Sequence, residues 1–250
     1  MDMKLYNYIL MLGDQSMILA HRLSELCGHG PTLETDIALT NISLDLFGQV
    51  RNYFRYAASI DEGDSTEDSI AFLRQERQYR SAILLEQPNT DFAFVMGRQF
   101  LFDVFHQLLL KDLINSKDEQ IAAIATKSIK EVNYHVRLSS QWIRRLGLGT
   151  EVSHQKMQNA IDTLLPFAHE LYTETGLEKE MKEQGIGADL IAIKDKYIAT
   201  VHEVLTESSI VFDNTSNRVA KGKQGMHTEH MGYIIAELQY MQRAYPNMQW

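Results

Sequence analysis

The sequence predicts an all-α protein, a bundle of long antiparallel helices with additional helices at its C-terminal end. Apolar residues recur at steps of three and four along most of the chain, the spacing that turns one helix face toward a core. Only 4 Pro and 14 Gly occur in the 250 residues, fewer than a turn-rich β fold needs. No alternation of apolar and polar residues is long enough to predict a sheet.

The first two helices have clear start and stop signals. The first is predicted over 4–27 and ends at the segment Cys27–Pro31, because glycine favours a helix stop and proline cannot continue the ladder. Thr32 can cap the second helix, which is predicted over 33–59. The acidic, glycine-containing segment 61–65 ends it.

A shorter helix is predicted over 66–84, before the turn Gln87–Thr90. Thr90 is placed to cap the next helix, expected over 91–115, and another follows over 117–146. Both long helices carry an uninterrupted stripe of steps of three and four, which predicts one buried face on each.

Three more helices are predicted, over 152–175, 187–211 and 227–244. The longest polar loop of the chain separates the last two, at 213–225. No repeat, low-complexity tract or change of composition divides the chain, so we expect a single helical domain over residues 1–250.

Composition argues against several classes of function. A net charge of −9 is unlike that of a nucleic-acid-binding protein. No window approaches the roughly 20 apolar residues that span a bilayer, and no apolar run with a cleavage site suggests a signal peptide. One cysteine allows no internal disulfide. We therefore expect a cytoplasmic protein without a membrane or nucleic-acid partner. Motifs of phosphate-binding loops and nucleophile elbows are also missing.

Polar residues on the apolar helix faces predict a buried polar centre. Charged groups in a core are costly unless they are paired or bind a metal. Four helices each place a carboxylate on such a face, and two of them add a histidine three or four residues away. The residues are Asp14, Asp45, Asp103, His106, Glu131 and His135.

This pattern is similar to the carboxylate-bridged di-iron site of ferritin-like bundles. That site takes a Glu-x-x-His pair from each of two helices and one carboxylate from each of the other two. Here Gly48 stands three residues after Asp45, and Tyr134 stands three after Glu131. The histidine comes one residue late, at His135, which turns it by about 100° around the helix.

The sequence therefore predicts a ferritin-like bundle with a degenerate metal site, that is, a buried hydrogen-bonded polar network without metal. Its members are Asp45, Gly48, Asp103, His106, Glu131, Tyr134 and His135. A one-metal site and a working di-iron site remain as alternatives.

Two further features suggest chemistry. His227-Thr228-Glu229-His230 looks like a metal cluster, but its position at a helix start favours capping and packing. In the preceding loop, Arg218, Lys221 and Lys223 could contact an anion such as coenzyme A, or a partner protein. A solvated basic loop is the simpler interpretation.

Four segments carry a resemblance to a known family: 26–58, 84–103, 130–158 and 225–250, the last ending in Trp250. The chain resembles the phenylacetic acid catabolic protein family nearly end to end, and within it the non-catalytic structural C subunits of the phenylacetyl-CoA 1,2-epoxidase (ring oxygenase) complex.

The resemblance implies a complex that epoxidises the ring of phenylacetyl-CoA with molecular oxygen. Electrons from NADPH arrive through a separate reductase, and a di-iron centre lies in the catalytic A subunit. This chain would pair with the A subunit, with a B subunit and the reductase in the larger complex. It would bind no cofactor and supply no catalytic residue. The alternative is an enzyme in its own right, a di-iron or mononuclear-iron monooxygenase with an unusual ligand set. An iron-storage protein is a weaker third reading.

Overall fold

The all-α prediction is confirmed. The computed structural model describes residues 2–63, 65–213, 217–246 and 248, and in these ranges it contains ten α-helices, two short 3₁₀ helices and no strand. The helices are α1 (Met3–Ser24), α2 (Leu33–Ile60), α3 (Glu67–Phe72), η1 (Glu76–Gln78), α4 (Ile83–Glu86), α5 (Phe92–Leu113), α6 (Glu119–Gly147), α7 (Glu151–Tyr172), α8 (Gly176–Glu183), α9 (Leu190–Glu207), η2 (Gly222–Gln224) and α10 (Glu229–Ala244).

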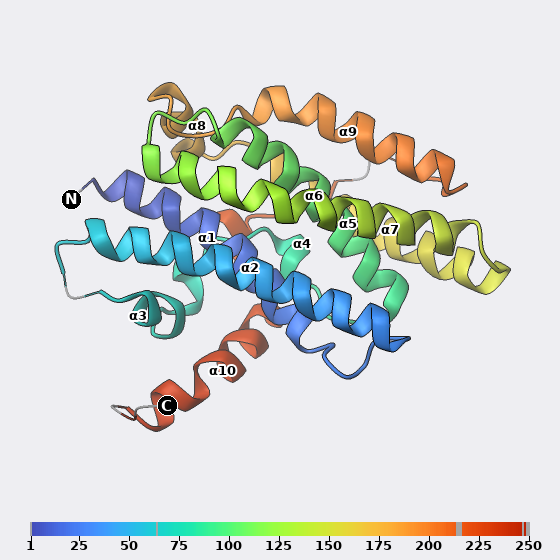
Figure 1. Cartoon of the computed structure of the whole chain (residues 1–250), viewed down its shortest axis with the longest axis horizontal. Coiled ribbons are helices and arrows are strands. Elements are labelled where there is room, and N and C mark those ends of the chain that lie inside the picture. Colours follow the sequence, from blue (N-terminus) through green and yellow to red (C-terminus); the bar gives the residue numbers. More distant parts are fainter. Residues whose placement is uncertain (1, 64, 214–216, 247, 249–250) are drawn as a thin grey trace.

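Two helix pairs form the bundle. α1 packs along α2, α5 packs along α6, and α2 contacts α6 (Figure 1). α5 also contacts α7 and α9, so it is surrounded by other helices. Accordingly, it is apolar or buried around most of its circumference, as expected of a central helix. α2 and α6 bury one face each and leave the other exposed.

Short polar side chains fix where the bundle helices begin. The Thr32 hydroxyl accepts the Thr35 amide at 3.3 Å at the start of α2, as predicted. The prediction that Thr90 caps the next helix is wrong by one residue. Asp91 is the N-cap of α5, and its carboxylate accepts the Phe94 amide at 2.9 Å. Both residue types accept a free amide of the first helical turn.

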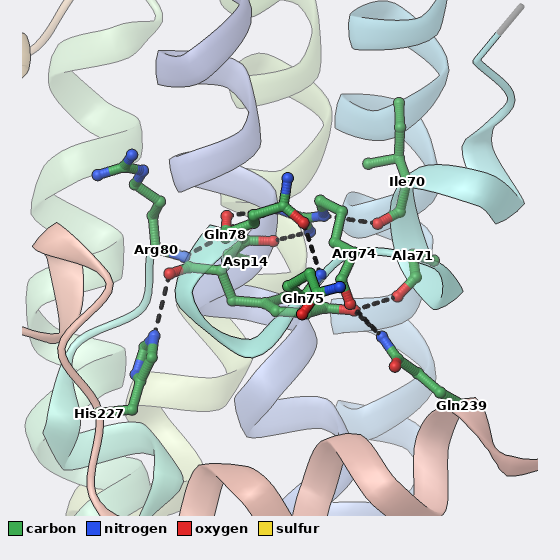
Figure 2. Close-up of polar contacts among 10 residues, drawn as sticks. Asp14, Ile70, Ala71, Arg74, Gln75, Gln78, Arg80, His227 and Gln239 are labelled. Carbon is green, nitrogen blue, oxygen red and sulfur yellow. Dashed lines mark hydrogen bonds and ion pairs between the residues drawn. The ribbon is translucent and has the colours of Figure 1, made fainter.

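The predicted helix over 66–84 is wrong. α3 ends at Phe72, and the chain then runs through η1 to α4. Arg74 explains the break, because its buried guanidinium pairs with the fully buried Asp14 of α1. The Asp14 carboxylate also accepts the backbone amide of Arg80 at 2.8 Å (Figure 2). A buried ion pair and a satisfied amide together outweigh local helix propensity here.

The C-terminal elements differ from prediction mainly at their ends. α7 stops at Tyr172, and the sequence interpretation missed α8. Thr175 and Glu178 form a capping box at the start of α8, with the Glu178 amide donating to the Thr175 hydroxyl at 3.2 Å. In the predicted polar loop, residues 214–216 lie outside the described part of the chain, as does Trp250.

α10 extends from one side of the bundle toward the C-terminal end (Figure 1). Its Gln239 amide donates to the Arg74 carbonyl at 2.7 Å and to the Tyr79 hydroxyl at 2.9 Å (Figure 2). The segment that carries Arg74 therefore joins α10 to α1. None of the described helices combines the length and apolarity needed to cross a bilayer.

Candidate functional site

The predicted polar centre lies along the seam between α2 and α6. These helices run antiparallel, because residues of increasing number on α2 meet residues of decreasing number on α6. His135 Nε2 lies 3.0 Å from Asp45 Oδ2, and the Gln49 amide donates to Glu131 at 3.4 Å. Farther along, the Tyr56 hydroxyl donates to Asp118 at 2.6 Å.

α5 supplies the deepest part of the centre. Asp103 is fully buried, and the amide of Gln99, one turn earlier, donates to its Oδ1 at 2.6 Å. His106 is also buried, with its ring 4.9 Å from that of Phe102. Figure 1 shows why α5 can bury these groups, since α6 and α7 run close beside it.

Burial decides the charge of this deep part. It raises the pKa of Asp103 from 3.8 to about 7, although the charge of His135 opposes the shift. Burial and the charge of His135 lower the pKa of His106 from 6.5 to about 3. At neutral pH, His106 is therefore uncharged and Asp103 is close to half protonated.

Nearer the surface, Glu131 keeps a different environment. Burial raises its pKa, the Gln49 hydrogen bond opposes that shift, and the negative charge of Asp45 adds to it. The Asp45 side chain is 34% exposed, whereas His135 is fully buried. The polar centre thus extends from the buried Asp103 and His106 on α5 to two partly exposed carboxylates, Asp45 and Glu131, at the seam between α2 and α6.

Gly48 and Tyr134 lie outside the polar cluster, although the sequence analysis counted both as members. Gly48 is exposed, and a Cβ built on it meets no atom within 4 Å. Tyr134 is 37% exposed, with the guanidinium of Arg137 5.6 Å from its ring. The inward positions fall one residue later, at Gln49 and His135, because residues four apart share a helix face.

The expectation that α1 adds a carboxylate is also wrong. Asp14 faces Arg74 and the backbone of Arg80, where it neutralises a buried guanidinium. His21 packs edge-on against Phe47, with ring centroids 5.1 Å apart. Burial lowers the pKa of His21 to about 4, so the imidazole is neutral.

The donor set does not fit a carboxylate-bridged di-iron group. Around His135, the seam and α5 offer three carboxylates, Asp45, Glu131 and Asp103, and burial raises the pKa of Asp103 to about 7, so that it is close to half protonated at neutral pH. Neutral amides of Gln49 and Gln99 occupy further inward positions, and an amide cannot offset the charge of two cations as a carboxylate does. In the described ranges, no three His, Cys, Asp or Glu side chains converge to hold a metal ion.

The predicted anion-binding residues do not converge. Lys223 is 2% exposed, and its ammonium group donates to both oxygens of Glu178, at 2.8 and 2.9 Å. It also donates to the Thr173 carbonyl at 2.8 Å. Arg218 is exposed over the Phe167 ring, and Lys221 is exposed. Both the solvated-loop and the anion-contact interpretations are therefore wrong for Lys223, which is a buried structural cation.

Two glycines allow this loop to pack closely. A Cβ on Gly222 would lie 2.2 Å from the Ser81 carbonyl oxygen, and one on Gly225 would lie 2.3 Å from that of Arg77. Gly225 also has a φ of +78°, which disfavours other residues. The two glycines thus let the loop lie directly against the backbone of Arg77 and Ser81.

His227 and Thr228 form a clasp at the start of α10. His227 Nδ1 lies 3.0 Å from the Glu86 carboxylate, and Nε2 lies 3.0 Å from the Tyr79 carbonyl oxygen. Thr228 donates its amide and hydroxyl to Glu86, at 2.7 and 2.8 Å. Both partners of the imidazole are acceptors, and although burial opposes the shift, the Glu86 contact raises the pKa of His227 and favours its charged form. Glu229 is exposed.

Sequence reasoning missed several residues of these clusters. Gln49 and Gln99 were not counted as members, although each lies four residues from a carboxylate on the same face. That spacing is a usable signal. Glu86 and Arg74 have no comparable signal, since their partners lie far away in the sequence.

Comparison with known proteins agrees with this architecture. The family model described as "Phenylacetic acid catabolic protein" matches residues 1–250. The chain is 44% identical over 243 residues to the C subunit of the 1,2-phenylacetyl-CoA epoxidase of Escherichia coli (strain K12), covering 97% of this chain and 98% of the relative. The chain belongs to the phenylacetic acid catabolic protein family.

Proposed function

We propose that this chain is the structural subunit of a phenylacetyl-CoA epoxidase, which pairs with the catalytic A subunit and stabilises it during aerobic phenylacetate degradation. The similarity to the Escherichia coli epoxidase protein over nearly all of both chains supports the assignment to such a complex. The polar centre supports a role without redox chemistry of its own.

One observation carries this proposal. The inward positions of α2 and α6 that follow Asp45 and Glu131 hold Gln49 and His135, and these side chains bond across the seam to the same two carboxylates. The carboxylates thereby hold the two helices in register through internal hydrogen bonds. Hydrogen bonds of this kind specify helix packing. Asp103 Oδ2 and the Nδ1 atoms of His106 and His135 are buried in the described structure without a hydrogen-bond partner.

The remaining parts of the proposal concern partners. The di-iron group would lie in the A subunit, and a B subunit and a reductase would complete the complex in the cytoplasm. This chain would bind no cofactor. A contact with phenylacetyl-CoA, if one forms, would have to use Arg218 or Lys221, because Lys223 is committed to Glu178.

Co-expression with the A subunit tests the proposal. Asp103→Asn combined with His106→Gln removes two groups that a metal could use, and both lie deep inside the chain. The proposal predicts an intact complex with unchanged epoxidase activity per A subunit. Activity lost from an intact, fully assembled complex would contradict it, because the centre of this chain would then take part in the chemistry.

An exposed matched variant provides the control. Asp195→Asn together with His202→Gln changes the same residue types on the exposed side of α9. The A subunit expressed without this chain should show little activity. Full activity of the A subunit alone would remove the need for a structural partner.

A further inference from the structure

The first half of α2 carries an exposed apolar ridge, which is interrupted by Asn41 and followed along the helix by the exposed Arg51 and Arg55. Its ridge consists of Leu33, Ile37 and Leu44, which are 72%, 51% and 61% exposed. The three residues project on one side of the helix, as steps of four and seven require. Figure 1 shows α2 running along the length of the molecule beside α6, with α3 on its other side.

A hollow lies on each side of this ridge. Toward α6, a groove of about 350 Å³ is lined by Ala38, Tyr134, Leu138 and Trp142, among others. Toward α1 and α3, a cavity of about 480 Å³ is lined by apolar residues such as Phe47, Phe54 and Phe72, and also by the polar residues His21, Arg51, Glu67 and Asp68. A ridge flanked by two grooves is the surface shape with which helices pack against one another.

Gly48 continues the exposed side of α2 one turn after Leu44. Glycine in the middle of a helix is destabilising by roughly 0.5–1 kcal/mol relative to alanine, and nothing within 4 Å of its Cβ position requires it in the isolated chain. The missing side chain leaves room for a second backbone to approach. Gly48 is therefore a second, independent sign of an external contact.

The charges beside the ridge indicate what kind of chain binds. Asp45 and Glu131 are partly exposed at the seam, and the negative charge of Asp45 adds to the effect of burial in raising the pKa of Glu131. Within the described ranges, neither carboxylate forms an ion pair with a lysine or arginine. The Gln49 carbonyl oxygen next to them is buried without a donor. A cationic donor on a partner would complement the two partly exposed carboxylates.

We propose that the α2 face, defined as Leu33, Ile37, Leu44 and Gly48 with the two adjoining grooves, docks a helical subunit that places a lysine or arginine over Asp45 and Glu131. This inference rests on the proposed function, and the occupant is the catalytic A subunit. A second copy of this chain fits less well, because the cations on the exposed side of its α2, Arg51 and Arg55, already pair with Glu67 of their own chain.

Binding to the purified A subunit tests the inference with matched variants. Leu44→Glu adds a charge at a 61% exposed site on the ridge, and Ile191→Glu adds one at a 63% exposed site on α9. Both sites are exposed, so folding should survive, and circular dichroism checks that. We expect Leu44→Glu to weaken binding by about tenfold or more and Ile191→Glu to leave it unchanged.

A second variant tests the charge complement. Asp45→Asn with Glu131→Gln should weaken binding and reduce its dependence on salt, since the cation of the partner loses its counter-charges. Equal affinity of Leu44→Glu and wild type would overturn the assignment of this face while leaving the proposed function intact.

Two other outcomes are informative. Failure of the wild-type chain to bind the A subunit at all would remove the proposed function together with this inference. A wild-type homodimer, detected by sedimentation and broken by Leu44→Glu, would assign the face to a second copy and overturn the choice of partner.

Discussion

Replacement of Asp103 by asparagine should stabilise the protein at neutral and alkaline pH. Asp103 is fully buried on α5, and burial raises its pKa from 3.8 to about 7. The folded state therefore holds a proton over a pH range in which the unfolded chain has already released it. The contribution of this carboxyl to the free energy of unfolding of the protein therefore falls as pH rises from about 4 to about 7.

The magnitude follows from the shift. A difference of about three pKa units, at about 1.4 kcal/mol per unit, sets an upper bound of about 4 kcal/mol on the penalty above pH 7. Relaxation of the interior reduces this, so we expect a gain of about 2 kcal/mol for Asp103→Asn at pH 8. The amide keeps an acceptor for the Gln99 side chain, which donates to Oδ1 at 2.6 Å.

Urea denaturation of wild type and variant at several pH values from 4 to 8 provides the assay. The difference in free energy of unfolding should be small at pH 4, grow through pH 7 and then level off. His106 and His21, whose pKa values burial lowers, act with the opposite sign. Both histidines are present in wild type and in the variant, so their contributions cancel in the difference between the two free energies of unfolding. A difference that does not change with pH would refute the argument, and Asp195→Asn on exposed α9 is the control.

Three further changes test other parts of the structure. Gly48→Ala should stabilise the isolated chain by about 0.5–1 kcal/mol, measured by urea denaturation, because its Cβ meets no atom within 4 Å; a loss of stability would reveal an unrecognised internal contact. Lys223→Met should cost about 3 kcal/mol or more, since it leaves Glu178 buried without its cation. Unchanged stability with weaker acyl-CoA binding by the complex would instead support an anion-binding lysine. The pKa of His227 is raised despite burial, mainly by the Glu86 contact, so the stabilisation that His227→Gln removes should be complete below pH 6.5 and shrink as pH rises through the folded-state pKa. A pH-independent difference between His227→Gln and wild type in denaturation experiments would contradict the charged clasp.

The long bundle helices could be predicted from the sequence because their signals are local. Steps of three and four define their buried faces, and capping residues define their starts. The segment after α2 could not be predicted this way. Its conformation depends on the pairing of Arg74 with Asp14, 60 residues earlier in the chain. α8 was missed although its capping box was visible in Thr175 and Glu178.

The polar centre was predicted in part. Asp45, Asp103, His106, Glu131 and His135 do lie near one another, as the helix stripes suggest. Gly48 and Tyr134 were included through the spacing of a metal motif, whereas the actual inward positions follow the helix face. The role of Lys223 was not predictable, because its partner Glu178 belongs to another element. In addition, the sequence of a polar segment does not show that one of its lysines is buried.

The most direct test of the structural-subunit proposal is the iron content per chain. The protein is purified alone from iron-rich culture, and again after co-expression with the A subunit. We predict near-zero iron in the protein alone, with iron and epoxidase activity only in the complex. About two irons per chain in the isolated protein, lost on replacement of Glu131 or His135, would contradict the account and assign the oxygen chemistry to this chain.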